Sequence, residues 1–177
     1  LFYSLEMQQV QLMMKIVASE TDINLNKVDN DTLTEAENDQ WYTALAQAGN
    51  KTMTILDRGN VSVRDIVSKA RQMNGQTGLD CIVIDYLQIM KYDKGKEISE
   101  LGNITRELKY LSKELDIPII LLSQLSRGVE QRENKRPLMS DLRSSGEIEQ
   151  DADCIIMVYR DEYYTKEESE DKGLAEI

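Results

Sequence analysis

Strongly apolar strands and amphipathic helices alternate in the middle of the sequence, and this pattern constrains the fold more than any other. Leu79–Asp85 is a run whose centre is apolar on both faces, which is typical of a strand inside a parallel sheet. Glu97–Leu115 places its apolar residues on one stripe at helical spacing, and Ile119–Leu122 is a second all-apolar strand. Strand, helix and strand in this order predict an α/β fold, with a mainly parallel, twisted sheet flanked by helices.

Weaker patterns on both sides extend the same architecture. We expect further strands at residues 1–5, 53–56 and 154–159, and further helices at residues 8–20, 62–73 and 140–142. Another helix is expected to begin at the capping box of Thr34 and Glu37, after a polar stretch at residues 21–31. No internal repeat or low-complexity linker divides residues 1–177. We therefore expect a single domain, with the acidic segment 161–177 as the only candidate for a mobile part.

Composition removes several classes of function. The chain has no histidine, which excludes Ser-His-Asp and Cys-His catalysis and imidazole zinc sites within it. No apolar run approaches the roughly 20 residues that cross a bilayer, and Leu1–Leu5 lacks the basic leader of a signal peptide. Cys81 and Cys154 each lie inside an apolar run, so we expect both thiols to be buried as small core hydrophobes. This use of cysteine fits a reducing cytoplasm, and we disfavour a disulfide between them.

Charge is unevenly distributed along the chain. A net charge of −11 argues against a broadly basic nucleic-acid surface. Residues 161–177 hold seven acids and two lysines, whereas residues 127–143 hold five basic residues and three acids. One local basic segment thus exists on an acidic protein, and any contact with nucleic acid is expected to be confined to a loop.

Polar side chains directly follow three of the predicted strands. Glu6 follows Leu5, Asp85 follows Ile84, and Ser123 and Gln124 follow Leu122. Because ligands of a parallel sheet bind at the carboxyl ends of its strands, this pattern predicts a site for a nucleotide and a metal ion at one edge.

Each of these side chains has a chemical role and an ordinary structural alternative. Asp85 can orient the water shell of a magnesium ion that bridges nucleotide phosphates, or can end a strand as a loop residue. Glu6 can accept a proton from an attacking water, or can stabilise the N-terminus of the next helix. Gln124 can donate a hydrogen bond to a γ-phosphate, or can satisfy backbone groups in a turn. Position alone favours the structural alternative for Asp85 and Glu6 and does not decide for Gln124.

Longer stretches make the pattern specific. The motifs that carry a family resemblance are Phe2–Met7, Ile82–Gln88, Ser123–Arg127, Asp141–Asp153 and Tyr159–Tyr164. In this order and at this spacing, they resemble the RecA-type ATPase domain of the DnaB family of replicative helicases from bacteria and phages. The similarity covers essentially the whole chain, although residues 24–60 are only loosely family-like.

This resemblance implies a RecA-like P-loop NTPase core that uses ATP and Mg²⁺. Glu6 would polarise the attacking water, Asp85 would be the Walker B residue that holds magnesium, and Gln124 would sense the γ-phosphate. Arg143, Ser144, Ser145 and Gly146 would form a loop that grips the backbone of single-stranded DNA. Family members commonly have glutamate in place of Ser144, and Arg143 has a solvated surface arginine as its ordinary alternative.

The resemblance also implies parts that residues 1–177 do not contain. The phosphate-binding loop Gly-x-x-x-x-Gly-Lys-Thr/Ser is absent, and we expect it before Leu1, with an arginine finger expected beyond Ile177. The chain is thus expected to be truncated at both ends and to hydrolyse ATP negligibly alone. Its parent would be a homo-hexamer that moves 5′→3′ on single-stranded DNA and binds a primase and a helicase loader. Two alternatives stay open here, namely another RecA-fold ATPase such as a recombinase, and a non-catalytic oligomerisation fragment.

Overall fold

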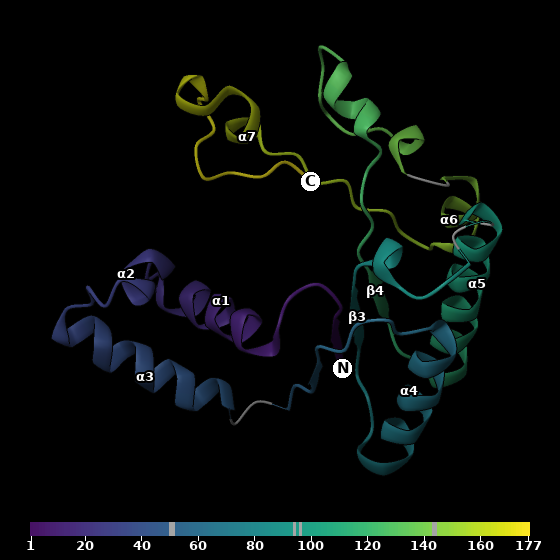
Figure 1. Cartoon of the computed structure of the whole chain (residues 1–177), viewed down its shortest axis with the longest axis horizontal. Helices are drawn as coiled ribbons and strands as arrows, with labels where there is room; N and C mark the ends of the chain where they lie inside the picture. The colour runs from purple at the N-terminus through teal and green to yellow at the C-terminus, as the bar shows by residue number, and fades with distance from the viewer. Residues whose placement is uncertain (50–51, 94, 96, 143–144) are drawn as a thin grey trace.

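The computed structural model describes residues 1–49, 52–93, 95, 97–142 and 145–177. Its centre is a parallel sheet with strand order β2-β1-β3-β4. The strands are β1 (Phe2–Ser4), β2 (Ile55–Leu56), β3 (Ile82–Asp85) and β4 (Ile119–Leu121). The strand that ends in Asp85 therefore lies between β1 and β4, and Figure 1 shows β3 beside β4. The predicted α/β fold with a parallel sheet is confirmed.

The connections between the strands carry helices. In the described residues the α-helices are α1 (Gln9–Thr21), α2 (Leu25–Asp29), α3 (Glu35–Gly49), α4 (Val63–Thr77), α5 (Glu97–Leu115), α6 (Ser145–Asp151) and α7 (Asp161–Thr165). Short 3-10 helices are η1 (Leu87–Ile89), η3 (Arg127–Gln131), η4 (Met139–Asp141) and η5 (Lys166–Glu168). Helix α5 has the predicted bounds, whereas α4 continues four residues beyond the predicted end at residue 73.

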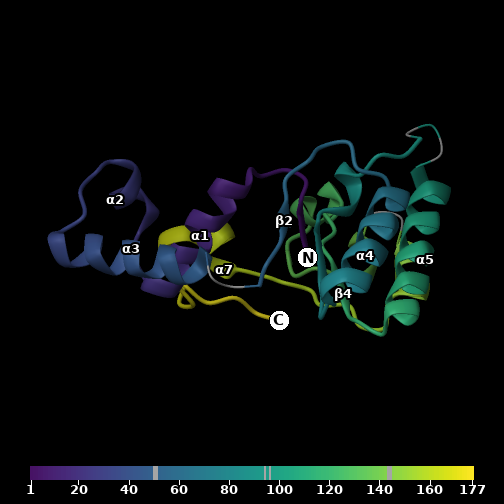
Figure 2. The same ribbon diagram turned by 90° about the horizontal axis from the view of Figure 1, so that it is seen from below.

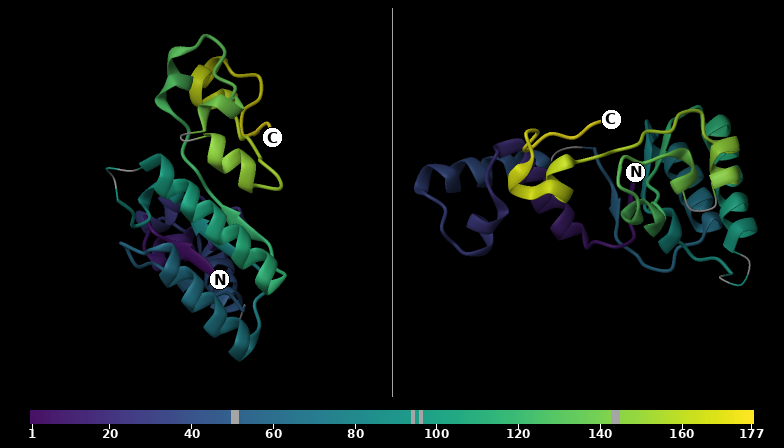
Figure 3. Two further views of the ribbon diagram at one scale, coloured as in Figure 1. Left: turned by 90° about the vertical axis from the view of Figure 1, so that its right-hand side faces the viewer. Right: turned by 90° about the horizontal axis from the view of Figure 1, so that it is seen from above.

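Helices α4 and α5 lie side by side and cover one face of the sheet, as Figures 2 and 3 show. Ile82 and Ile84 of β3 point into this interface and are fully buried, whereas Val83 and Asp85 on the other face are half-buried. The helical residues packed around them include Ile66, Ala70, Leu101, Ile104, Leu108 and Leu111. The apolar stripe predicted for α5 is thus the surface that holds this helix on the sheet.

Helices α1, α2 and α3 form a second packing unit that projects away from the sheet (Figure 1). Its buried residues are Val17, Ile23, Trp41 and Ala48. The predicted capping box is present, because the Glu37 amide donates to Thr34 Oγ1 at 3.3 Å and the Thr34 amide donates to the Glu37 carboxylate at 2.9 Å. Helix α2 was not predicted from its polar sequence. Its N-terminus is capped by Asn24, whose side chain accepts the Asn26 amide at 2.9 Å.

The prediction of a strand at residues 154–159 is wrong. Ile155 and Met157 pack against the core while Ile156 and Val158 are 65% and 58% exposed, so successive side chains do point to opposite faces. In the described part of the chain, however, this segment has no neighbouring strand, and its one ladder contact is an isolated antiparallel bridge from Tyr159 to Glu176. The apolar run indicated a strand but did not supply a hydrogen-bonded partner for its backbone.

Two predictions about burial also need correction. Cys154 is exposed and Cys81 is half-buried, so neither thiol is a fully buried core residue, and both are free. Strand β4 is not buried on both faces, because Ile120 is 53% exposed at the end of the described sheet. An all-apolar run therefore did not distinguish the central strand β3 from the terminal strand β4.

None of the helices in the described residues is both long enough and apolar enough to cross a membrane.

Candidate functional site

The ends of β1 and β3 meet at the carboxyl edge of the sheet. Ser4 is paired in register with Asp85, and the Leu5 amide donates to the Asp85 carbonyl oxygen at 2.9 Å. This bond is the last between the two chain segments before Glu6, whose side chain is exposed. Asp85 is half-buried at the end of the central strand. Glu6 and Asp85 thus stand on neighbouring segments at the same edge.

Strand β4 brings Gln124 to this edge from the other side of β3. Leu121 pairs with Ile84, and the Leu122 amide donates to the Ile84 carbonyl oxygen at 3.0 Å. The chain then leaves the sheet, and Gln124 is exposed two residues later. The structure therefore places Glu6, Asp85 and Gln124 at one edge of the sheet, as the sequence pattern predicts.

Gln88 bridges the segment after β3 and the segment after β4. Its side-chain nitrogen donates to Ser123 Oγ at 2.8 Å, and its side-chain oxygen accepts the backbone amide of Gln124 at 3.1 Å. The Leu87 amide also donates to the Leu122 carbonyl oxygen at 2.9 Å. Backbone and side-chain contacts thus join the two segments that carry Asp85 and Gln124.

The segment after Gln124 contacts the segment that precedes Arg143. Leu125 forms an antiparallel bridge with Leu142, and the Ser126 amide donates to the Asp141 carbonyl oxygen at 2.6 Å. A short backbone path therefore connects Gln124 at the sheet edge with the start of the predicted DNA loop.

Asp141 is a buried anchor at this junction. Asp141 is only 5% exposed. Its carboxylate accepts two hydrogen bonds from the Arg132 guanidinium, at 2.8 and 2.6 Å. It also accepts the Leu138 amide at 2.8 Å. The Arg132 guanidinium, followed by the Leu138 amide, lowers the pKa of the Asp141 carboxyl below its usual value. Asp141 is therefore held as a carboxylate, two residues before Arg143.

Part of the predicted DNA loop lies outside the described residues. This applies to Arg143 and Ser144, and only the backbone of Ser145 is described, as the first residue of α6. Gly146 is exposed in the first turn of α6, and a Cβ there would meet no atom within 4 Å apart from its chain neighbours and the backbone of its own helix.

Helix α6, which follows the loop, lies beside α5 (Figure 3). Polar side-chain contacts join α5 to this segment. Thr105 Oγ1 donates to the Asp151 carboxylate at 2.6 Å. The pairs Arg106–Glu147 and Lys109–Asp153 flank this hydrogen bond. The far end of the predicted loop is thereby fixed to the helix that covers the sheet.

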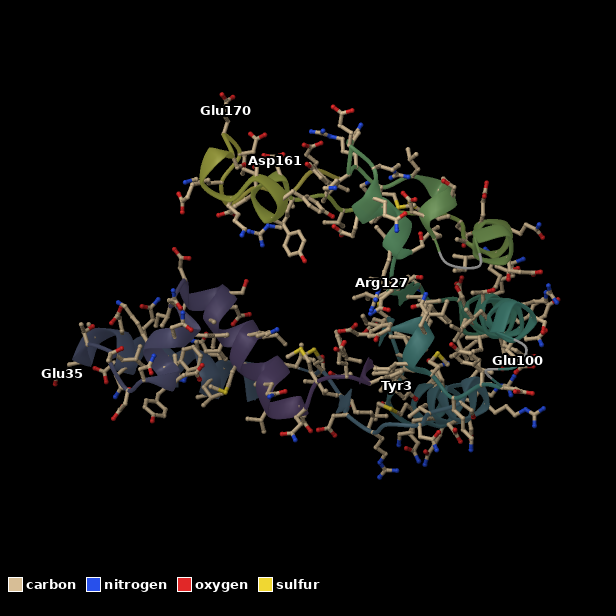
Figure 4. All side chains as sticks on the ribbon, turned by 45° about the horizontal axis from the view of Figure 1, so that its top comes forward. Tyr3, Glu35, Glu100, Arg127, Asp161 and Glu170 are labelled. Atoms are coloured by element: carbon tan, nitrogen blue, oxygen red, sulfur yellow. The ribbon has the colours of Figure 1, made fainter. Side chains whose placement is uncertain are left out.

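Most of the basic residues described in the 127–142 segment bind groups of the protein itself. Arg136 pairs with Glu176 at 2.6 Å and stacks over the Tyr159 ring at 4.7 Å, and Lys135 donates to the Glu130 carbonyl oxygen at 2.9 Å. Arg127 is exposed where the segment leaves the sheet (Figure 4). The local excess of basic residues thus serves largely to fold this segment and to hold residues 159–176 beside it.

The carboxylate of Asp85 has the chemistry of a magnesium ligand. No group of three or more Asp, Glu, Cys or His residues that could hold a metal ion occurs among the described residues. Magnesium is commonly held by one or two carboxylates together with water and substrate phosphates. Asp85, at the end of the central strand, provides one such carboxylate.

Solved structures with the same fold define the class. One solved ATPase domain superposes with a TM-score of 0.89 at 38% identity, over 98% of this chain and 63% of that one. A DnaB-like replicative helicase, solved in a study of its interactions with primase, gives 0.87 at 38% identity, over 96% of this chain and 42% of that one. The fold is that of a RecA-like helicase ATPase domain.

A family model described as the DnaB-like helicase C terminal domain matches residues 1–177. The replicative DNA helicase DnaC of Bacillus subtilis is 43% identical over 99% of this chain, and the replicative DNA helicase DnaB of Geobacillus stearothermophilus is 44% identical over 99%. The chain belongs to the DnaB-like helicase C-terminal domain family. It spans 39% of the length of each of these two relatives. Membership in this family argues against the alternative of a recombinase-like ATPase.

Sequence reasoning did not assign roles to Gln88, Arg132 or Asp141. Gln88 and Asp141 lie inside the motifs that carry the resemblance, but their partners are 35 and 9 residues away in the sequence. A signal for the Arg132–Asp141 pair was available, since both residues were counted in the basic segment. Only the folded chain shows that these opposite charges neutralise each other.

Proposed function

We propose that this chain is part of the ATP-driven motor of a hexameric replicative DNA helicase, which unwinds duplex DNA by moving 5′→3′ along single-stranded DNA. The observation that carries this proposal is the path from the sheet edge to the loop at residues 143–146. Asp85 and Gln124 stand at the ends of adjacent strands, and the Leu125–Leu142 bridge follows directly. In a family of replicative helicases, such a path can transfer a movement of the sheet edge, caused by the state of the bound nucleotide, to the loop that holds DNA.

The carboxylates at the edge have separate tasks in this mechanism. Asp85, at the end of the central strand, would hold the Mg²⁺ of bound MgATP, which neutralises charge on the phosphates. Glu6, exposed on the adjacent segment, would accept a proton from the attacking water and orient it. The rigid sheet fixes the spacing of the two segments, so the water is aimed without reorganisation of the backbone.

Gln124 would donate a hydrogen bond from its side-chain amide to the γ-phosphate. When that phosphate leaves, the hydrogen bond is lost and the segment after β4 is free to shift. Leu125 and Ser126 would carry the shift to Leu142 and Asp141, to which they are bonded.

The loop from Arg143 to Gly146 would hold the DNA backbone. An arginine, two hydroxyl groups and backbone amides near a glycine bind phosphates without reading bases, as a motor that crosses every sequence requires. A local phosphate-binding loop also reconciles DNA binding with the net charge of −11.

The partners proposed for the whole protein are further copies of itself in a hexamer, a primase and a helicase loader, with the cytoplasm as its location. In a hexameric ring, a loop on each subunit would face one central strand of DNA. The primase is supported by the similar DnaB-like helicase whose structure was solved in a study of its interactions with primase.

Unwinding by the full-length protein tests the proposed function. Purified protein is mixed with Mg²⁺, ATP and forked duplexes that carry a free 5′ tail, a free 3′ tail or both. We expect strand separation only with ATP and a 5′ tail on the strand that is encircled. Strand separation without ATP hydrolysis, or none with any fork, contradicts the proposal. The Asp85→Asn variant is expected to lose unwinding together with Mg²⁺-dependent nucleotide binding.

A further inference from the structure

The hydrogen-bond ladder between β3 and β4 is continued beyond the sheet by a side chain. The last backbone bonds of this ladder join the Leu122 amide to the Ile84 carbonyl oxygen and the Leu87 amide to the Leu122 carbonyl oxygen. The next contact along β4 is made by Gln88, whose side-chain oxygen accepts the Gln124 amide at 3.1 Å. The backbone of Gln124 is thus positioned by a residue three places after Asp85.

Both ends of the Gln88 amide are used in this contact. While the oxygen accepts from Gln124, the nitrogen donates to Ser123 Oγ at 2.8 Å. A primary amide supplies one acceptor and two donors on a planar group, so it can hold two successive residues at once. An apolar side chain of the same length can hold neither.

Gln88 is itself anchored on a fixed support. It lies in η1 between Leu87, which is fully buried, and Ile89, which packs against the core. Met90, also buried, donates its amide to the Leu87 carbonyl oxygen at 3.2 Å. The turn that carries Gln88 is therefore fixed to β3. The Gln88 side chain thus sets where the segment after β4 lies relative to Asp85.

We propose that Gln88 is a positioning residue for ATP hydrolysis, which sets the position of Gln124 relative to Asp85. This inference rests on the proposed function, in which Gln124 contacts the γ-phosphate. With the Gln124 amide held at 3.1 Å, the Gln124 side chain starts from a fixed backbone and can reach the phosphate in one geometry. Without that bond, the segment would explore several positions and the contact with the phosphate would form in only a fraction of turnovers.

Two substitutions separate positioning from general support of the fold. Gln88→Met keeps the size and removes both hydrogen bonds. Gln88→Glu keeps the acceptor for the Gln124 amide, and the Ser123 hydroxyl can rotate to donate to the second carboxylate oxygen. The matched control is Gln76→Met, at an exposed position near the end of α4.

The experiment measures ATP turnover of the full-length protein with saturating single-stranded DNA, per nucleotide-binding site. Gln88→Met is expected to lower kcat about tenfold, the effect of roughly one lost hydrogen bond, with KM for ATP little changed. Gln88→Glu is expected to retain most of kcat, and Gln76→Met is expected to match the parent. A kcat for Gln88→Met equal to that of Gln76→Met overturns the inference.

A double variant distinguishes this inference from the proposed function. Gln124→Ala is expected to lower kcat, and Gln88→Met added to it is expected to lower kcat no further, because Gln88 acts through Gln124. If the two effects multiply, Gln88 acts independently and the inference is overturned. If Gln124→Ala lowers kcat while Gln88→Met does not, the inference alone fails. If Gln124→Ala leaves kcat unchanged, the role proposed for Gln124 fails as well.

Discussion

The guanidinium of Arg132 donates two hydrogen bonds, of 2.8 and 2.6 Å, to the buried carboxylate of Asp141. A fork of this kind fixes both the distance and the plane of the two groups, which a lysine cannot do. The Asp141 carbonyl oxygen in turn accepts the Ser126 amide, so the pair holds the junction between the segment after Gln124 and the start of the predicted DNA loop. Arg132 lies in the basic segment, yet its charge is used inside the protein.

This relationship predicts how Arg132 acts on DNA binding. In the full-length protein, Arg132→Ala should weaken the binding of single-stranded DNA about tenfold, because the loop that holds phosphates is no longer fixed. The slope of log K against log salt should stay the same, since the Arg132 guanidinium is bound to Asp141. A phosphate-binding arginine would instead reduce that slope by about 0.7 on a single strand.

Binding is measured by fluorescence anisotropy across a salt series. Arg64→Ala, at an exposed position on α4, is the control and should change neither the affinity nor the slope. Arg132→Lys should resemble Arg132→Ala, because a point charge does not reproduce the fork. A reduced slope for Arg132→Ala contradicts this account.

The hydrogen bond from Thr105 on α5 to Asp151 on α6 is expected to stabilise the fold. Thr105→Val removes the hydroxyl that donates to Asp151 at 2.6 Å, and keeps the shape of a side chain that is buried. The free energy of unfolding should fall by about 1–3 kcal/mol, because the Asp151 carboxylate loses a donor. Urea denaturation at 25 °C measures the change. Thr77→Val, at the exposed end of α4, should stay within about 0.5 kcal/mol of the parent, and equal losses for the two variants contradict the prediction.

The lowered pKa of Glu37 predicts that the thermal stability of the unit formed by α1, α2 and α3 depends on pH. Its hydrogen bond with Lys27, followed by those with Thr34, lowers the pKa of the Glu37 carboxyl from 4.5 to about 2. A lowered pKa stabilises the fold above the unfolded value of 4.5, and this stabilisation is lost as the pH falls from 4.5 toward 2. Glu37→Gln should therefore melt at a lower temperature than the parent at pH 7.

The difference in Tm between Glu37→Gln and the parent should shrink as the pH falls through this window. Circular dichroism melts at pH 7, 4 and 2.5 measure it. Glu35→Gln, in the same first turn of α3, controls for the loss of a negative charge near the helix N-terminus. A difference in Tm that is the same at all three pH values rules out the assigned cause.

The sequence predicted the fold where one local pattern determines the structure. Helix α5 has the predicted bounds because its apolar stripe and its length both mark a surface helix. The order of Glu6, Asp85 and Gln124 at one sheet edge was also predictable, since every strand of a parallel sheet ends on the same side.

The parts that were not predicted depend on neighbours distant in the sequence. Residues 154–159 have the apolar run of a strand, but a strand also needs a hydrogen-bonded partner, which no local pattern reveals. Gln88 carried no assignment because the function of an amide depends on what it faces, here Ser123 and Gln124. Arg132 entered only the charge balance of residues 127–143 for the same reason.

Substitution of Glu6 tests most directly whether the carboxyl edge of the sheet is the site of ATP hydrolysis. The full-length Glu6→Gln variant is compared with Glu170→Gln, an exposed control outside the sheet edge, in both ATP turnover and equilibrium nucleotide binding. We expect Glu6→Gln to lower kcat by about 10²–10⁴-fold, the usual contribution of a general base, while nucleotide binding stays within about threefold of the parent. A Glu6→Gln variant that hydrolyses ATP as fast as Glu170→Gln contradicts the role of this edge in catalysis.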